Sequence, residues 1–238
     1  MELAPDQFEA AAAMVGAHAA GLVLPGMRLG LGSGRMATGF IRQLRPRIAS
    51  GLQVQGLCTS RATEALAREA GVGLLSSSRG GLDLDVDGAD EFDSSLSLLK
   101  GGGGALLREK VVAERSRRFW FLADASKRVA RLGSEHPVPV EVLRYDWEGT
   151  AARCETRLGC RAQLRLREDH PVISDNGNFL LDLDFPGGLA DPQAVAAGLS
   201  AIAGVLGHGL FLGQATAGLI FDSGGVQLLG DLDFDRGW

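Results

Sequence analysis

The sequence predicts an α/β protein, with a mostly parallel sheet followed by a second, smaller α+β domain. The chain has 238 residues, of which 45% are hydrophobic and 22% charged, enough for one large globular domain or two small ones. Strands alternate with helices up to about residue 123, which is typical of βαβ units and a parallel sheet. Beyond Pro137 the expected order becomes β-α-β-β-α-β, the ferredoxin-like order.

In the first half, polar residues mark where helices begin. Asp6 is expected to cap the first helix and Ser60 the third, because short polar side chains at a helix N-terminus accept backbone N–H bonds. The helices are expected over Gln7–Leu22, Met36–Ile48, Ala62–Ala70 and Ala105–Arg117, and the strands over Met27–Leu31, Leu52–Leu57, Val72–Leu75, Leu82–Val86 and Arg118–Ala123.

The second half begins after a boundary marked by Pro137 and Pro139. Strands are expected over Val138–Leu143, Ala162–Leu166, Phe179–Phe185 and Val205–Leu212, and helices over Asp146–Leu158 and Asp191–Ala203, the latter capped by Asp191 with Pro192 at its first position. A closing hairpin, Gly218–Phe221 and Val226–Leu229, is expected to return to the first domain. We therefore expect a first domain of residues 1–135 plus 213–238 and a small domain of residues 136–212.

Composition excludes several classes of protein. The net charge of −5 argues against nucleic-acid binding. The most apolar stretch, Ala10–Leu24, is shorter than the roughly 20 residues of a membrane span. Three cysteines without a CxxC pair favour a reduced, cytoplasmic protein. The four histidines lack the spacing of metal ligands, so we expect no metal.

A first glycine loop, Gly30–Gly34, lies between an expected strand and an expected helix, where backbone N–H groups bind anions. No Asp or Glu occurs from Ala10 through Thr63, so the acid that holds a ribose in a dinucleotide site is missing. The same stretch carries six arginines, Arg28, Arg35, Arg42, Arg45, Arg47 and Arg61. We favour a phosphate site; a structural tight turn and an NAD site are the alternatives.

An acidic strand runs from Leu82 to Val86 and continues to Glu91. Alternation places Leu82, Leu84 and Val86 on one face and Asp83, Asp85 and Asp87 on the other. The aspartates resemble the start of a calcium loop, but its twelfth position holds Ser94 instead of Glu. Asp83 and Asp85 are expected to face solvent. Asp87 and Asp90 flank Gly88 and Ala89 at the carboxyl end of the strand, where open α/β sheets bind ligands.

A second glycine loop, Gly101–Gly104, follows Lys100 and precedes the helix that carries Glu109. Four glycines permit close backbone approach and a second nest of N–H groups. Only three of the 24 basic residues are lysines, Lys100, Lys110 and Lys127. The alternatives are a merely structural loop and, for Glu109 and Lys110, an ordinary solvated helix face.

Taken together, seven segments resemble the ribose-5-phosphate isomerase A family. They run in the family's order across nearly the whole chain: Leu29–Gly34, Asp87–Glu91, Lys100–Gly103, Leu107–Lys110, Ala123–Lys127, Pro139–Val142 and Ser174–Asn178. The resemblance implies a Rossmann-like domain with a small α+β lid. It also implies interconversion of ribose 5-phosphate and ribulose 5-phosphate in the non-oxidative pentose phosphate pathway, without cofactor or metal, by a homodimer or homotetramer.

The resemblance also implies roles for individual residues. Glu109 would be the general base, and Asp87 would help open the sugar ring and shuttle protons between O1 and O2. Lys100, with Asp90 and the glycine-loop N–H groups, would stabilise the oxyanion. The remaining substrate-binding residues would be Ser33, Gly34, Arg35, Met36, Gly88, Ala89, Gly101, Gly102, Gly103 and Lys127.

Two departures from the family pattern concern the phosphate. Arg35 and Met36 stand where the family has Ser-Thr hydroxyls, and Phe8-Glu9 stands near the family's usual first-helix lysine. Arg35 would either supply a guanidinium to the phosphate or fill its site. The alternatives to the isomerase are therefore an isomerase for a different phosphosugar, a non-catalytic sugar-phosphate-binding protein and an NAD oxidoreductase.

Overall fold

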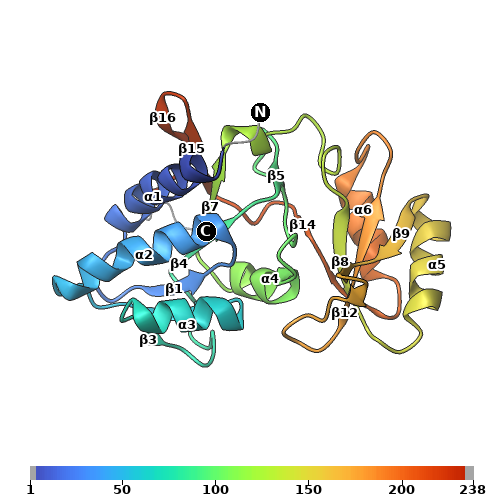
Figure 1. The fold of residues 1–238 in the computed structure, drawn as a ribbon, viewed down its shortest axis with the longest axis horizontal. Helices are drawn as coiled ribbons and strands as arrows, with labels where there is room; N and C mark the ends of the chain where they lie inside the picture. Colours follow the sequence, from blue (N-terminus) through green and yellow to red (C-terminus); the bar gives the residue numbers. More distant parts are fainter. Residues whose placement is uncertain (1–3, 234–238) are drawn as a thin grey trace. The chain divides into compact units, whose positions relative to one another are not determined.

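The structure, a computed structural model, describes residues 4–233, which form two compact units, each with its own hydrophobic core. The first unit contains residues 4–89, Arg108–Arg128 and residues 213–233 (Figure 1). The second contains Asp90–Leu107 and Val129–Leu212. The predicted α/β class, a Rossmann-like domain with a ferredoxin-like α+β domain, is confirmed.

The first unit is built on a seven-stranded sheet in the order β16-β15-β7-β4-β1-β2-β3. All neighbouring strands pair in parallel except β15 and β16, which form the antiparallel closing hairpin. This hairpin joins the sheet through the parallel pairing of β15 with β7. The strands are β1 (Arg28–Leu31), β2 (Gln55–Cys58), β3 (Gly73–Leu74), β4 (Leu84–Gly88), β7 (Phe119–Asp124), β15 (Ala217–Asp222) and β16 (Gly225–Gly230).

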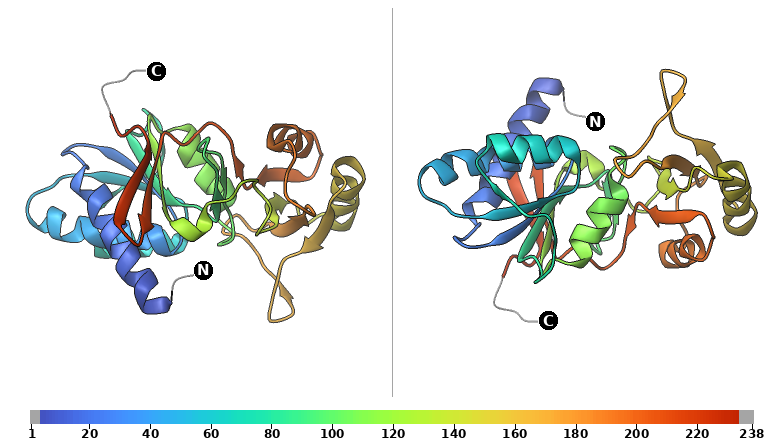
Figure 2. Two further views of the ribbon diagram at one scale, coloured as in Figure 1. Left: turned by 90° about the horizontal axis from the view of Figure 1, so that it is seen from above. Right: turned by 90° about the horizontal axis from the view of Figure 1, so that it is seen from below.

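Helices cover both faces of this sheet. α1 (Pro5–Gly21) and α2 (Arg35–Ala49) pack against each other (Figures 1 and 2), so closely that a Cβ on Gly16 would lie 2.6 Å from the carbonyl carbon of Gly39. They share one core with the side chains of alternate strand residues such as Leu29 and Leu31. Gly30, between those two, meets Val112 of α4 (Leu106–Glu114), which places α4 on the opposite face. α3 (Arg61–Glu69) contacts β2 and β3.

The second unit contains a four-stranded antiparallel sheet in the order β13-β8-β12-β9. Its elements run β8 (Val138–Val142), α5 (Trp147–Leu158), β9 (Arg161–Leu164), β12 (Phe179–Asp184), α6 (Pro192–Ser200) and β13 (Val205–His208). The predicted β-α-β-β-α-β order is therefore observed, with the 4-1-3-2 strand arrangement of a ferredoxin-like unit. Asp191 caps α6 as predicted, accepting a hydrogen bond from the N–H of Ala194.

Shorter strands complete the second unit. β14 (Leu210–Phe211), β6 (Leu98–Leu99) and β5 (Glu91–Phe92) form a three-stranded sheet, and β10 (Leu166–Arg167) pairs with β11 (His170–Pro171). The single strand predicted over Val205–Leu212 is thus wrong. It is divided at Gly209 between two sheets, because the chain there approaches Lys100 so closely that a Cβ on Gly209 would lie 2.0 Å from the Lys100 carbonyl oxygen.

Two further sequence expectations differ from the structure. α1 begins at Pro5 with Ala4 as its N-cap, so Asp6 lies in the first turn and does not cap the helix. Residues 90–107 and 129–135 belong to the second unit, whereas the predicted division has them in the first domain. Residues 90–107 lie there because β5 and β6 pair with β14. The ends of the predicted first domain, residues 1–3 and 234–238, lie outside the described residues.

Within residues 4–233, no helix combines the length and apolar character that crossing a membrane requires. The same residues hold no group of three or more His, Cys, Asp or Glu side chains arranged to bind a metal ion.

Candidate active site

The predicted site residues of the first unit follow strands that end at the same edge of its sheet. Because β1, β2, β4 and β7 are parallel, their carboxyl ends lie together, the usual location of ligand sites in such sheets. Ser33 follows β1, Gly88 ends β4, and Lys127 lies in a short 3₁₀ turn (Ala125–Lys127) after β7. Lys127 is half-buried.

Asp87 joins β4 to the first glycine loop. Its carboxylate is fully buried, and Oδ1 accepts hydrogen bonds from the N–H of Ser33 at 2.9 Å and of Gly88 at 2.7 Å. A Cβ on Gly32 would lie 2.1 Å from the Asp87 carboxyl carbon, so only glycine fits there. One task of this loop is therefore to hold a carboxylate of the neighbouring strand, which its sequence alone did not reveal.

Asp85 corrects a sequence expectation. The solvent-facing position predicted for it is wrong, because α4 covers that face of the sheet and leaves Asp85 with no exposed surface. Gly30, its partner in the β1–β4 register, makes the room, since a Cβ there would lie 2.5 Å from Oδ1 of Asp85. Asp83 is half-buried, and its Oδ2 accepts a hydrogen bond from the Arg28 N–H at 2.8 Å.

A cluster of hydroxyl groups that the sequence analysis did not assign to the site holds the loop from the other side. Ser33 Oγ lies 2.7 Å from Thr59 Oγ1 and 3.3 Å from Thr63 Oγ1, and Thr63 Oγ1 donates to the Gly32 carbonyl at 3.0 Å. Ser60 caps α3 as predicted. In the sequence, the hydroxyl residues of the run Thr59-Ser60-x-x-Thr63 directly after a strand could have indicated this cluster. From the sequence alone, we interpret them only as the start of a helix.

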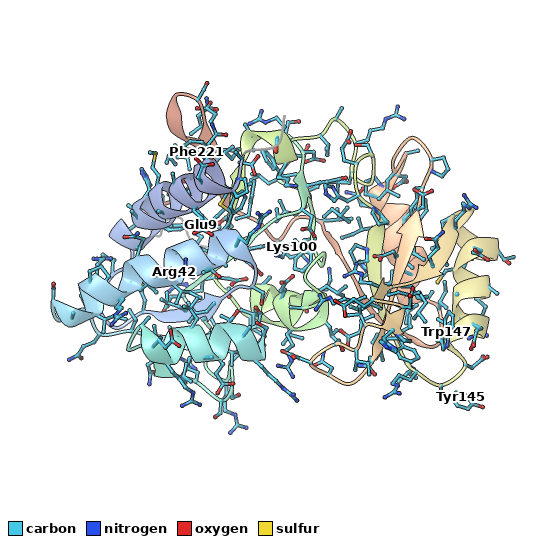
Figure 3. The ribbon with its side chains drawn as sticks, in the orientation of Figure 1. Glu9, Arg42, Lys100, Tyr145, Trp147 and Phe221 are labelled. Carbon is cyan, nitrogen blue, oxygen red and sulfur yellow. The ribbon has the colours of Figure 1, made fainter. Side chains whose placement is uncertain are left out.

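Three of the six arginines in the acid-free stretch, Arg28, Arg42 and Arg47, make contacts away from the first glycine loop. Arg28 donates to the Arg79 carbonyl at 2.8 Å, and Arg47 donates to the Ala20 and Val23 carbonyls at the end of α1. Arg42 of α2 pairs with Glu9 of α1 at 3.5 Å on the surface (Figure 3).

Arg35 and Met36 open α2 directly after Gly34, whose φ of +90° suits glycine. Arg35 is exposed, and its guanidinium carbon lies 3.9 Å from the centre of the Phe8 ring, a cation–π contact. Met36 is buried, with its Cβ beside Gly88. The two departures from the family pattern, at position 8 and position 35, are therefore in contact with each other.

Asp90 and Lys100 belong to the second unit. Asp90 Oδ2 accepts a hydrogen bond from the Gly102 N–H at 2.7 Å, so Asp90 and the second glycine loop are brought together as predicted. Lys100 is 3% exposed, and its Nζ lies 5.5 Å from the centre of the Phe211 ring (Figure 3). Its N–H donates to the Gly209 carbonyl at 2.8 Å. Gly101 takes the positive φ of +105° that the turn requires.

Glu109 lies in the first turn of α4, in the first unit, and is 4% exposed. The alternative interpretation as a solvated helix face is therefore wrong for Glu109. Asp85 and Asp87, on the sheet face that α4 covers, are also buried. A desolvated carboxylate is suited to moving protons.

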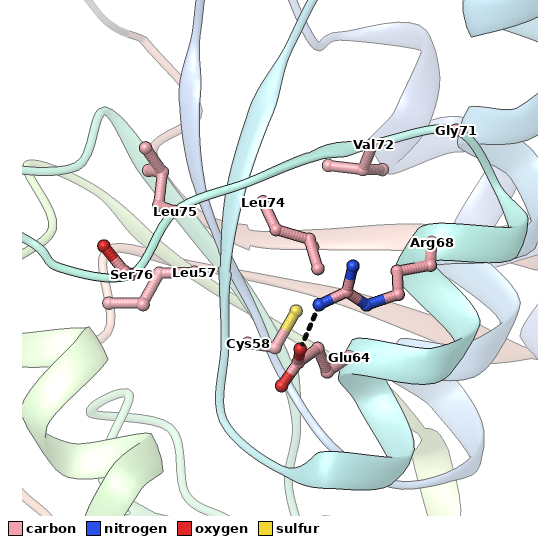
Figure 4. Close-up of a pocket in the computed structure, with 9 residues that line it drawn as sticks. All are labelled: Leu57, Cys58, Glu64, Arg68, Gly71, Val72, Leu74, Leu75 and Ser76. Atoms are coloured by element: carbon pink, nitrogen blue, oxygen red, sulfur yellow. Dashed lines mark hydrogen bonds and ion pairs between the residues drawn. The ribbon is translucent and has the colours of Figure 1, made fainter.

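A separate surface hollow lies next to β3, the outermost strand of the first sheet, between α3, β2 and β3 (Figure 4). Its wall carries Cys58 and the ion pair between Glu64 and Arg68, 2.6 Å apart. Burial, together with the nearby Glu64 charge, raises the pKa of the Cys58 thiol to about 11, so this thiol is protonated at neutral pH and is a poor nucleophile.

Comparison with known proteins shows to which family the chain belongs. The family model described as ribose 5-phosphate isomerase A (phosphoriboisomerase A) matches residues 55–225. The chain belongs to the ribose 5-phosphate isomerase A family. It is 46% identical over 217 residues to the ribose-5-phosphate isomerase A of Sinorhizobium fredii, covering 89% of this chain and 93% of that protein.

Solved structures of ribose 5-phosphate isomerases share the fold. That of ribose 5-phosphate isomerase A from Methanocaldococcus jannaschii is 34% identical, with a TM-score of 0.88 over 94% of this chain and 99% of its own. A D-ribose-5-phosphate isomerase in complex with phospho-erythronic acid is 33% identical, with a TM-score of 0.89 over the same shares of the two chains. Membership in the ribose 5-phosphate isomerase A family identifies the chain as an enzyme of the isomerase class.

Proposed function

We propose that this enzyme interconverts D-ribose 5-phosphate and D-ribulose 5-phosphate through an enediolate, with Glu109 as the general base. The observation that carries the proposal is the buried Glu109 carboxylate at the start of α4, directly after the second glycine loop. Family membership and the carboxylates Asp87 and Asp90, each hydrogen-bonded to glycine-rich backbone, support it.

The chemistry explains why these residue types are needed. In the open-chain aldose, Glu109 removes the proton on C2, and the electrons of that bond form the C1–C2 double bond of an enediolate. The proton then returns to C1, while a proton moves from O2 to O1 and leaves the carbonyl at C2. Asp87 performs this transfer between the oxygens and assists opening of the sugar ring.

The negative charge that develops on the oxygens requires preorganised donors. Lys100 and the N–H groups of Gly101 and Gly103 supply them, while the Gly102 N–H donates to Asp90 and so holds the loop. The first glycine loop binds the phosphate of the substrate. The residues that bind the substrate are Ser33, Gly34, Arg35, Met36, Gly88, Ala89 and Lys127. Loss of one oxyanion donor typically costs roughly 2.7–4 kcal/mol of transition-state stabilisation.

The first test is proton NMR of ribose 5-phosphate in D₂O with the chelator-treated enzyme. Ribulose 5-phosphate that carries deuterium at C1 is the expected product, because solvent deuterium enters when the base exchanges its proton. Turnover without any exchange with solvent would contradict a solvent-accessible enediolate, and no turnover with retained binding would favour the sugar-phosphate-binding protein.

Substitution of the base is the second test. Glu109→Gln should lower kcat by between about 10²- and 10⁴-fold, since such bases contribute that much, with KM little changed. Glu114→Gln, an exposed position at the end of the same helix, is the matched control and should keep the wild-type rate. If Glu109→Gln retained more than about a tenth of the rate, Glu109 would not be the base.

An isomerase for a different phosphosugar is the second candidate, because Arg35 and Met36 replace the family's hydroxyls. Kinetics with a panel of phosphopentoses and phosphohexoses distinguishes the two. The pathway, the cytoplasmic location, the absence of cofactor and the homodimer or homotetramer stay predictions.

A further inference from the structure

Arg165 links the sheet of the second unit to the second glycine loop. It lies between β9 and β10, at a break in the strand that the sequence predicted as continuous over Ala162–Leu166. Its guanidinium makes a two-point contact with the Asp182 carboxylate of β12, through Nε at 2.9 Å and through Nη2. The third nitrogen, Nη1, donates to the carbonyl oxygens of Gly101 at 2.8 Å and Gly102 at 3.1 Å.

One peptide unit of the loop is held at both ends by this arrangement. The Gly101 carbonyl and the Gly102 N–H belong to the same trans peptide and point in opposite directions. The oxygen accepts from Arg165, and the N–H donates to Asp90 Oδ2 at 2.7 Å. A Cβ on Gly102 would lie 2.9 Å from Asp90 Oδ1, so glycine permits the contact. One continuous series of hydrogen bonds thus runs from Asp182 through Arg165 and the peptide to Asp90.

We propose that Arg165 is a positioning residue for the reaction, acting through the Gly101–Gly102 peptide on Asp90 and on the backbone that follows Lys100. This inference rests on the proposed function. A cationic donor on the carbonyl polarises the peptide and strengthens its N–H as a donor to Asp90, because hydrogen bonds in series reinforce one another. The same contact fixes the orientation of the loop before any substrate binds.

Asp182 orients the guanidinium. The Arg165 and Asp182 side chains are 15% and 23% exposed, so water competes little with their contacts. Arginine is required because its planar fork reaches the carboxylate and both carbonyls at once, whereas the single ammonium of lysine serves one of them.

The test compares Arg165→Met and Arg165→Lys with Arg161→Met, a matched control on the exposed side of β9. Arg165→Met should lower kcat by between about 10- and 100-fold, the scale of a misplaced catalytic group, with KM within about threefold of wild type. Arg165→Lys should recover part of the loss, and Arg161→Met should match wild type. Unchanged kcat in Arg165→Met would overturn the proposal.

Two readouts separate positioning from simple stabilisation. In Arg165→Met the Gly102 amide proton should shift upfield and exchange faster with solvent, because its hydrogen bond to Asp90 weakens. An unchanged Gly102 amide resonance would overturn the proposal that Arg165 acts through this peptide. Asp182→Asn removes the ion pair but keeps the carbonyl contacts of Arg165, so it should lower kcat less than Arg165→Met does. Equal losses would identify the pair as only a stabilising contact.

The remaining outcomes are also decisive. If Arg165→Met does not fold, Arg165→Lys is judged by the same kcat and amide measurements. If the wild-type enzyme does not isomerise ribose 5-phosphate, the proposed function fails, whereas the amide shift and exchange of Gly102, measured without substrate, still decide the role of Arg165.

Discussion

The Arg35 side chain directly follows the first glycine loop, where we propose that the phosphate of the substrate binds. It is exposed and held over the Phe8 ring, 3.9 Å from the ring centre, at the first position of α2. The N-terminus of a helix already attracts anions, and a fixed guanidinium adds a formal charge and a fork of donors. The contact with Phe8 holds the Arg35 side chain against α1.

We therefore expect Arg35 to act as a phosphate ligand. Arg35→Ser, which restores the family's hydroxyl, should raise KM for ribose 5-phosphate about tenfold, since a hydrogen bond to a charged group contributes roughly 1.5–3 kcal/mol. The kcat should change less than twofold. Phe8→Leu, which keeps the bulk but removes the ring, should raise KM by a smaller factor. A lower KM in Arg35→Ser would show instead that Arg35 fills the phosphate site.

At the scale of elements, glycines on and just after β1 lie opposite aspartates of β4. Gly30 pairs in register with Asp85, and Gly32, just beyond the strand, meets Asp87. Because each of these two glycines lacks a side chain, each leaves room for one carboxylate of β4. The glycines of the first loop are therefore needed for the acidic strand as much as for a ligand.

Gly32→Ala tests this complementarity. The added methyl would lie within 2.4 Å of three atoms of Asp87, so the carboxylate or the strand must move. We expect loss of stability by about 1–3 kcal/mol, as in overpacked cores, and loss of most activity through the displaced Asp87. Urea unfolding and kcat measure the two effects. Gly21→Ala, where a Cβ meets nothing within 4 Å, is the control and should leave both unchanged or stability slightly higher. Wild-type stability in Gly32→Ala would contradict the steric argument.

The same elements show what the sequence could predict and why the rest escaped it. Periodicity and capping located the long helices and strands, and alternation correctly separated Leu84 and Val86 from Asp85 and Asp87. Which face of β4 is exposed depends on where α4 packs, and the alternation of residue types along the strand does not predict that packing. Two-residue strands such as β5 and β6 carry no periodic signal. Arg165 was missed because its partners are 17 and 64 residues away in the chain.

At the scale of the whole molecule, the chain passes back and forth between its two units. The first unit consists of three segments and the second of two, so the chain crosses four times, after Ala89, Leu107, Arg128 and Leu212. Asp90, Glu109 and Lys127 each lie within two residues of a crossing. Three of the proposed site residues therefore lie where the chain passes from one unit to the other, and neither unit is one continuous stretch of chain.

This interleaving predicts cooperative unfolding, because neither unit can lose its fold without freeing chain ends that the other constrains. Trp120 reports on the first unit and Trp147 on the second, so single-tryptophan variants that keep only one of them should give coincident urea transitions by fluorescence. Leu29→Ala in the first core and Leu181→Ala in the second, both fully buried, should each cost about 2–5 kcal/mol and lower the midpoint seen by both probes. A Leu29→Ala shift confined to the Trp120 signal would show instead that the two units fold independently.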